Sequence, residues 1–136
     1  MGIKSQSIVA VDHDAHSLDQ IRMIVDSTHI VLATADPNRA LAWLQNDATV
    51  SAVIVAQNLR GGNALGILES AKNLRPEARR ILIASYSDLA QFVEGLHSGA
   101  IQRTISKPID ASELLGLVRI RVGVASPHLA VQVPAA

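Results

Sequence analysis

The chain has 136 residues, about half of them hydrophobic, with no cysteine and a formal net charge of zero. This length suits one ordinary domain with a sizeable core, and the lack of cysteine excludes disulfides, thiolate metal sites and a cysteine nucleophile. The neutral charge, scarce aromatic residues and short apolar runs argue against nucleic-acid binding, a signal peptide or a membrane span, so we expect a soluble cytoplasmic protein.

Five short runs with strand character alternate with helical patterns along the chain. They span residues 7–11, 29–34, 52–56, 80–84 and, more weakly, 101–106. Several runs are continuously apolar, which is typical of strands covered on both faces. The sequence therefore predicts an α/β fold, a doubly wound (βα)5 parallel sheet in the order 2-1-3-4-5, as in flavodoxin-like proteins.

Helix start signals lie between these runs. Asp36 followed by Pro37 fits an N-cap with proline at the first helical position, and Asp110 with Glu113 fits a capping box. The periodicity fades after about Val124. We expect one domain over 1–123 and a tail or linker over 124–136.

Chemically useful residues follow four of the predicted strands. In a sheet of this order, function lies at the carboxyl ends of the strands, beside the switch point between strands 1 and 3. The segments at these ends are Asp12-His13-Asp14, the loop from Gln57 to Asn63, Ala84-Ser85-Tyr86 and Ser106-Lys107-Pro108.

Together, the acids after the first strand, the glycine-rich loop, "SYSDL" and "RTISKPID" resemble the receiver domain of bacterial two-component response regulators. The pattern R-x-x-[ST]-K-P-x-D, from Arg103 to Asp110, is similar to the branch often attached to HD-GYP phosphodiesterase outputs. The resemblance implies two acids that hold Mg²⁺ and an aspartate ending strand 3 that accepts a phosphoryl group from a histidine kinase. It also implies a Thr or Ser ending strand 4 and a lysine after strand 5 that both contact the phosphate.

The acceptor and hydroxyl positions depart from this pattern. Alignment without gaps places Ala56 at the acceptor position and Ala84 at the hydroxyl position. A shift of one or two residues would bring Gln57 or Asn58 to the acceptor position, and neither forms an acylphosphate. A shift of one at strand 4 would offer Ser85, so the loss of the hydroxyl is the less secure of the two.

The first loop keeps one matching acid, Asp12, with His13 where a second acid is expected. Asp14 is better explained as the N-cap of the first helix than as a metal ligand. His13 and His16 with Asp12 would be adequate for a transition metal, but nothing else supports that site. We expect weak or no Mg²⁺ binding, no cofactor, and a structural ion pair between Asp12 and Lys107.

Two further features have alternative readings. The glycines of "RGGNAL" fit a tight turn better than a phosphate cradle, and Trp43 fits ordinary core or a partly covered surface. The fifth helix, from Leu114 to Val124, has more apolar positions than one core-facing stripe needs, which indicates either a second buried face or strand-like alternation.

The resemblance implies that the fourth helix, fifth strand and fifth helix form the surface for dimerisation and output. The candidate interaction residues there are Phe92, Arg103, Leu117, Arg119 and Arg121. We predict a non-phosphorylatable pseudo-receiver that is not an enzyme and that binds another signalling protein, an output domain or a second copy. The alternatives are a small-molecule or anion sensor that uses the vacated pocket, and an active receiver with an unrecognised acceptor.

Overall fold

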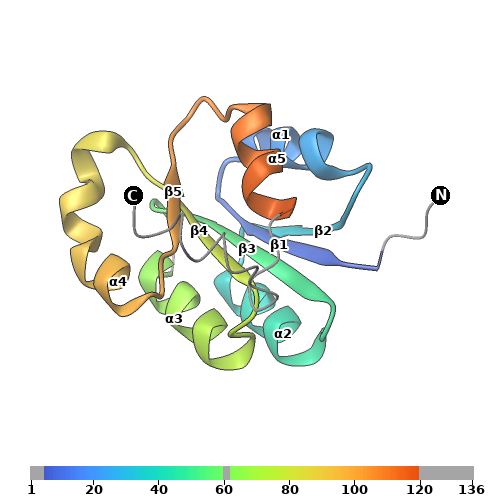
Figure 1. Ribbon diagram of the computed structural model, residues 1–136, viewed down its shortest axis with the longest axis horizontal. Coiled ribbons are helices and arrows are strands. Elements are labelled where there is room, and N and C mark those ends of the chain that lie inside the picture. Colours follow the sequence, from blue (N-terminus) through green and yellow to red (C-terminus); the bar gives the residue numbers. More distant parts are fainter. Residues whose placement is uncertain (1–4, 60–61, 120–136) are drawn as a thin grey trace, which may run out of the picture.

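The computed structural model describes residues 5–59 and 62–119, in which five parallel strands form one sheet in the order β2-β1-β3-β4-β5 (Figure 1). The predicted fold class and strand order are confirmed. The strands are β1 (Ser7–Val11), β2 (Ile30–Thr34), β3 (Val50–Ala56), β4 (Arg79–Ile83) and β5 (Arg103–Ile105).

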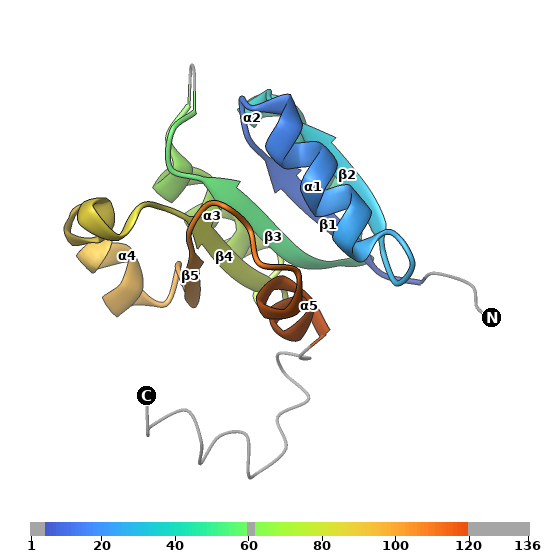
Figure 2. The same cartoon turned by 90° about the horizontal axis from the view of Figure 1, so that it is seen from above.

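Helices cover both faces of the sheet, as Figures 1 and 2 show. One apolar cluster packs between the sheet and the pair α1 and α5, and a second packs between the sheet and the pair α2 and α3. A 3-10 helix, η1, leads into α4 beyond the β5 edge of the sheet. The helical elements are α1 (Ala15–Val25), α2 (Pro37–Asn46), α3 (Ala64–Leu74), η1 (Tyr86–Phe92), α4 (Val93–Ser98) and α5 (Ala111–Arg119).

Side-chain caps start the helices where the sequence predicts them. The carboxylates of Asp14, Asp36 and Asp110 accept backbone N–H groups in the first turns of α1, α2 and α5. Asn63 plays the same part for α3, with its side-chain oxygen 3.3 Å from the amide nitrogen of Gly66. These bonds satisfy donors that a helix terminus otherwise leaves unpaired.

The last two strands differ from their predicted bounds. β4 begins at Arg79 rather than residue 80 and ends at Ile83, which leaves Ala84 in the loop that follows. β5 spans only Arg103–Ile105 of the predicted 101–106. β5 is an edge strand with one neighbour, β4. It is therefore a strand only over the three residues that pair with Ile81–Ile83.

In its described part, the fifth helix is a helix and not a strand. Leu114 and Val118, four residues apart, are buried, while Leu115 and Leu117 are partly buried against the same cluster. The apolar positions beyond Arg119 and the expected tail over 124–136 lie outside the described residues. Trp43 is partly buried against the other cluster, as predicted. Among the described residues, no helix is both long and apolar enough to cross a membrane.

Candidate functional site

The carboxyl ends of β1, β3 and β4 and the loop after β5 enclose a cavity of about 240 Å³. All the residues predicted for the pocket line it, together with both alternatives for the acceptor position. Three further side chains complete the lining: one at the end of β4, one in the loop after it and one in η1. The lining residues are Asp12, His13, Ala56, Gln57, Asn58, Ile83, Ala84, Ser85, Asp88 and Lys107.

Two of the lining residues, Asp12 and Lys107, form an ion pair. Lys107 Nζ lies 2.9 Å from Asp12 Oδ2, and the side chain of Asp12 is 0% exposed while that of Lys107 is 39% exposed. The other oxygen, Asp12 Oδ1, accepts the backbone N–H of Asp14 at 2.9 Å. The predicted ion pair is therefore present, with a buried anion and a half-exposed cation.

Asp14 belongs to the helix cap and stands at the margin of this pair. Its Oδ2 accepts the hydroxyl hydrogen of Ser17 at 3.0 Å and lies 3.7 Å from Lys107 Nζ. The Ser17 hydroxyl, and less strongly the His16 amide and the Lys107 charge, hold the pKa of Asp14 below its ordinary value. The predicted N-cap role of Asp14 is confirmed.

His13 connects the loop after β1 to the loop after β3. Its Nδ1 lies 2.6 Å from the backbone oxygen of Asn58 and 3.7 Å from Asp12 Oδ1. Because a carbonyl oxygen only accepts, Nδ1 carries the hydrogen and is not free to bind a metal. The described residues contain no group of three or more His, Cys, Asp or Glu side chains placed to hold a metal ion. The expectation of weak or absent Mg²⁺ binding stays a prediction.

The ends of β3 and β4 present methyl groups to the cavity. Ala56 is the last residue of β3 and pairs with Ile83, the last residue of β4. Ala84 follows and donates its N–H to the Ile105 oxygen at 2.9 Å. Both alanines are buried. Ala56 therefore ends β3 at the cavity and Ala84 follows the end of β4, while their assignment to the acceptor and hydroxyl positions stays a prediction.

Gln57 turns its side chain across the cavity to the loop after β4. Its Oε1 accepts the Ser85 backbone N–H at 2.7 Å, and its Nε2 donates to Asp88 Oδ2 at 2.6 Å. The Ser85 hydroxyl donates to the same Asp88 oxygen at 2.7 Å. The bonds from Ser85 and then Gln57 keep the pKa of Asp88 below its ordinary value. We call these three side chains the Gln57 bridge.

Sequence reasoning missed the part that Asp88 plays. It belongs to the "SYSDL" stretch, three residues after Ser85, which is the spacing of a local Asp-to-Ser contact at a helix start. The contact with Gln57, in contrast, joins residues 31 positions apart. No local pattern indicates it.

The predicted interaction residues differ in accessibility. Phe92 and Leu117 are partly buried against the two apolar clusters, Arg103 is half-buried and Arg119 is exposed. Arg121 lies outside the described residues. The most exposed apolar side chains of this region are instead on η1 and α4: Tyr86, Val93 and Leu96.

Comparison with known proteins agrees with the fold. The family model of the response regulator receiver domain matches residues 8–119. The hydrogenase transcriptional regulatory protein HoxA of Cupriavidus necator is 28% identical over 88% of this chain. The photosynthetic apparatus regulatory protein RegA of Rhodobacter capsulatus is 31% identical over 80% of it.

These relatives are longer than the region they share with this chain. The match covers 24% of HoxA and 59% of RegA. Among solved structures, the signal receiver domain of an HD domain-containing protein from Pseudomonas fluorescens Pf-5 has a TM-score of 0.76 and 26% identity. That alignment covers 88% of each chain. Fold, cavity and family model agree, and the chain belongs to the response regulator receiver domain family of two-component signalling.

Proposed function

We propose that this receiver domain does not accept a phosphoryl group and works as a constitutive protein-interaction module. One observation carries the first half: the residue that ends β3 inside the cavity is Ala56, which has no nucleophilic oxygen. The next side chain, Gln57, is an amide already engaged by Ser85 and Asp88. An amide is not converted to an acylphosphate by simple phosphoryl transfer.

The remaining groups of the cavity support the same proposal. Lys107 is neutralised by Asp12, and Ala84 brings no hydroxyl to a phosphate. Mg²⁺ binding is weak or absent in this proposal because one buried carboxylate paired with an ammonium is a poor site for a hard dication. The domain therefore keeps the scaffold of the family and performs no chemistry of its own.

A phosphorylation assay tests the first half. The protein is incubated with acetyl phosphate and Mg²⁺, beside a receiver that is known to be phosphorylated, and its intact mass is measured. We expect no added phosphoryl mass. Ala56→Asp is the matched variant, and we expect little or no modification because His13 and Ala84 still replace groups that the reaction uses. A hydroxylamine-sensitive mass increase in the wild-type protein would overturn the proposal.

The interaction half is supported by exposed apolar side chains on η1 and α4. Tyr86 is 89% exposed, Val93 46% and Leu96 39%. Large apolar side chains exposed on two successive helical elements favour a surface that a partner covers. A second copy or another signalling protein would bind across α4, β5 and α5. Sedimentation of the wild-type protein and of Leu96→Asp tests the homodimer. A homodimer is supported if the wild-type protein is dimeric and the variant is monomeric.

A sensor is the second candidate, and the cavity is the observation that favours it. Its lining contains the carboxylates of Asp12 and Asp88 against the single ammonium of Lys107. Negative charge therefore exceeds positive charge, which disfavours an anion and leaves a neutral, hydrogen-bonding molecule. A thermal-shift screen of neutral metabolites supports the sensor if a stabilising ligand loses its effect in Ala84→Leu, which fills the cavity.

A further inference from the structure

Arg79, at the amino end of β4, has a guanidinium with no partner. The residue is only 7% exposed, and its Nε is enclosed without a hydrogen-bond acceptor. Within residues 5–59 and 62–119, no hydrogen bond or ion pair engages this side chain. A buried charge without a partner is costly, so its presence calls for an explanation.

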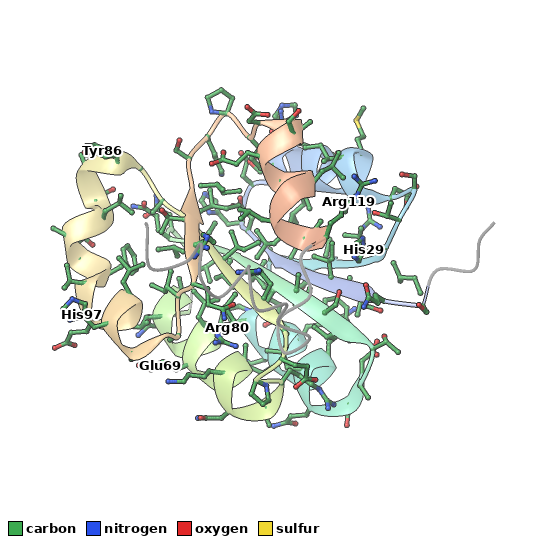
Figure 3. The ribbon with its side chains drawn as sticks, viewed as in Figure 1. His29, Glu69, Arg80, Tyr86, His97 and Arg119 are labelled. Atoms are coloured by element: carbon green, nitrogen blue, oxygen red, sulfur yellow. The ribbon has the colours of Figure 1, made fainter. Side chains whose placement is uncertain are left out.

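The neighbouring Arg80 shows that this fold can satisfy a buried arginine. Its guanidinium donates to the backbone oxygens of Pro76, Ala78 and Gly99 at 2.9 to 3.2 Å. Figure 3 labels Arg80, near the amino end of β4, on the side of the sheet where α2 and α3 lie. Strand side chains alternate between faces, so Arg79 points to the opposite face, the one that α1 and α5 cover. The described part of the fold therefore supplies hydrogen-bond acceptors to the guanidinium of Arg80 but not to that of Arg79.

A second arginine lies on that face, one strand away. Ile81 follows Arg79 on the same face of β4 and pairs with Arg103 of β5. Arg103 is half-buried, and its Nη1 donates only to the backbone oxygen of Gln102 at 2.7 Å. Burial lowers the pKa of Arg79, and the charges of Arg103 and Arg80 lower it further, with no carboxylate acting in the other direction. The two guanidinium groups form a small, uncompensated positive site.

The chain itself has no remaining acid to neutralise this site. All twelve Asp and Glu residues lie in the described part, and no ion pair joins any of them to Arg79. Residues 1–4, 60–61 and 120–136 contain no Asp or Glu. No Asp or Glu side chain of these 136 residues therefore compensates the charge of Arg79.

We propose that Arg79 and Arg103 form a receptor for a carboxylate on an acidic segment of a partner protein. This inference rests on the proposed interaction role and adds the chemistry of the partner. The receptor lies at the amino ends of β4 and β5, whereas the cavity lies at the carboxyl ends of the strands. A recessed arginine pair suits one planar carboxylate, held by several charge-assisted hydrogen bonds. Nucleic acid would need an extended row of cations on a basic domain, and this chain is neutral.

Binding of a hexaglutamate peptide with blocked ends tests the receptor by fluorescence anisotropy. We expect saturable binding that weakens at least about tenfold in Arg79→Met and in Arg103→Gln, the loss expected for a charged hydrogen bond. Arg39→Gln is the matched control, because exposed Arg39 on α2 carries the same charge. An equal loss in Arg39→Gln, or no saturable binding, would overturn the proposal. So would tighter binding of a single-stranded DNA of equal charge.

The stability of Arg79→Met provides an independent readout. Because the variant removes an unpaired buried charge, we expect a urea midpoint at or above that of the wild type. A clearly lower midpoint would show that the guanidinium is satisfied within the domain and would contradict the receptor. If Arg79→Met folds poorly, peptide binding by Arg103→Gln still tests the receptor. Phosphorylation of the protein would overturn the proposed function without changing either result.

Discussion

The two members of the ion pair between Asp12 and Lys107 differ in burial, and this difference decides how much stability each substitution costs. The carboxylate is fully buried and the ammonium is half-exposed. Removing Asp12 leaves an ammonium that water can reach and that Asp14 Oδ2, at 3.7 Å, can still attract. Removing Lys107 leaves a buried anion with a single described hydrogen bond, from the Asp14 amide.

We therefore predict that Lys107→Met costs more stability than Asp12→Ala. The expected losses are about 3 kcal/mol and about 2 kcal/mol, since the penalty is mainly that of the charge left without its partner. The double variant should recover part of the larger loss because neither charge remains. Urea melts of all four proteins measure this cycle. An Asp12→Ala protein as stable as the wild type would show that the pair does not stabilise the fold.

The residue scale also shows where sequence reasoning stops. The ion pair was predictable because a lysine whose head group is buried needs an anion, and Asp12 is the acid that follows the first strand at the same edge of the sheet. The direction of the Gln57 side chain does not follow, since it depends on the loop after β4 reaching back over the cavity. The unpartnered state of Arg79 does not follow from the sequence either, because it depends on which acceptors the packed structure brings near its side chain.

At the scale of elements, the Gln57 bridge holds the segment from Ser85 to Asp88 against the end of β3. That segment begins η1 and leads to the exposed apolar residues of η1 and α4. A side-chain amide thus ties the loop after β4 to the end of β3.

We predict that Gln57→Ala loosens this loop with little effect on global stability. The two hydrogen bonds of Gln57 lie at a half-exposed site and contribute modestly to folding, but they are the described tie between the end of β3 and η1. Amide hydrogen exchange over residues 85–92 should accelerate, while exchange in β1 and β3 stays unchanged. Gln45→Ala, on the exposed face of α2, is the control. Unchanged exchange over residues 85–92 would show that the bridge does not set the loop.

Two helical glycines have opposite roles, which gives a paired prediction. A Cβ on Gly95, in α4, would lie 2.6 Å from Leu65 Cδ1 and 2.7 Å from Ile101 Cδ1. A Cβ on Gly116, in α5, meets nothing within 4 Å. Gly95→Ala should therefore cost about 1 to 2 kcal/mol through overpacking, and Gly116→Ala should add up to about 1 kcal/mol through helix propensity.

Thermal or urea melts of the two variants compare these effects directly. The same change of one methyl group is made in both helices, so the difference reports the packing of α4 and not the chemistry of alanine. Equal stability of the two variants would mean that α4 shifts freely to accept the added atom. α4 would then not be held closely against Leu65 and Ile101.

The type and order of the strands and helices could be predicted from the sequence more fully than the residues at which they begin and end. Apolar runs and caps indicate strands and helices locally, and the parallel order follows from the common connection of such units. The bounds of β5 depend on which of its residues lie beside β4, so they require the assembled sheet. The same applies to the places of Ala56, Gln57 and Asn58 around the cavity, which depend on where β3 ends beside β4.

For the whole molecule, pH dependence comes from groups whose protonation differs between the folded and unfolded chain. His29 precedes β2 and is 4% exposed, with Nδ1 bonded to the Thr28 hydroxyl at 2.8 Å. Its Nε2 is enclosed and has no hydrogen-bond partner. Burial first, and then the charge of Arg119, lower the pKa of His29 below its ordinary value of 6.5. Figure 3 shows these two residues on neighbouring elements.

A lowered histidine pKa means that the unfolded chain takes up a proton before the folded chain does. The contribution of neutral His29 is therefore complete above the unfolded pKa of 6.5 and is lost as the pH falls through that value toward the lower folded pKa. Three carboxylates with lowered pKa, those of Asp14, Asp47 and Asp88, lose their contributions only below their ordinary value of 3.8. The two effects occupy separate pH ranges.

We predict that the urea midpoint falls between about pH 7.5 and pH 5, and that His29→Gln removes a large part of this fall. Glutamine has no charge to acquire in this range, so the folded and unfolded chains of the variant bind protons more equally. His97→Gln, on the exposed face of α4, is the control and should keep the pH dependence of the wild type. If His29→Gln shows the same fall as the wild type, a different group titrates on unfolding, and the enclosed imidazole next to α5 does not limit the stability of the domain in weak acid.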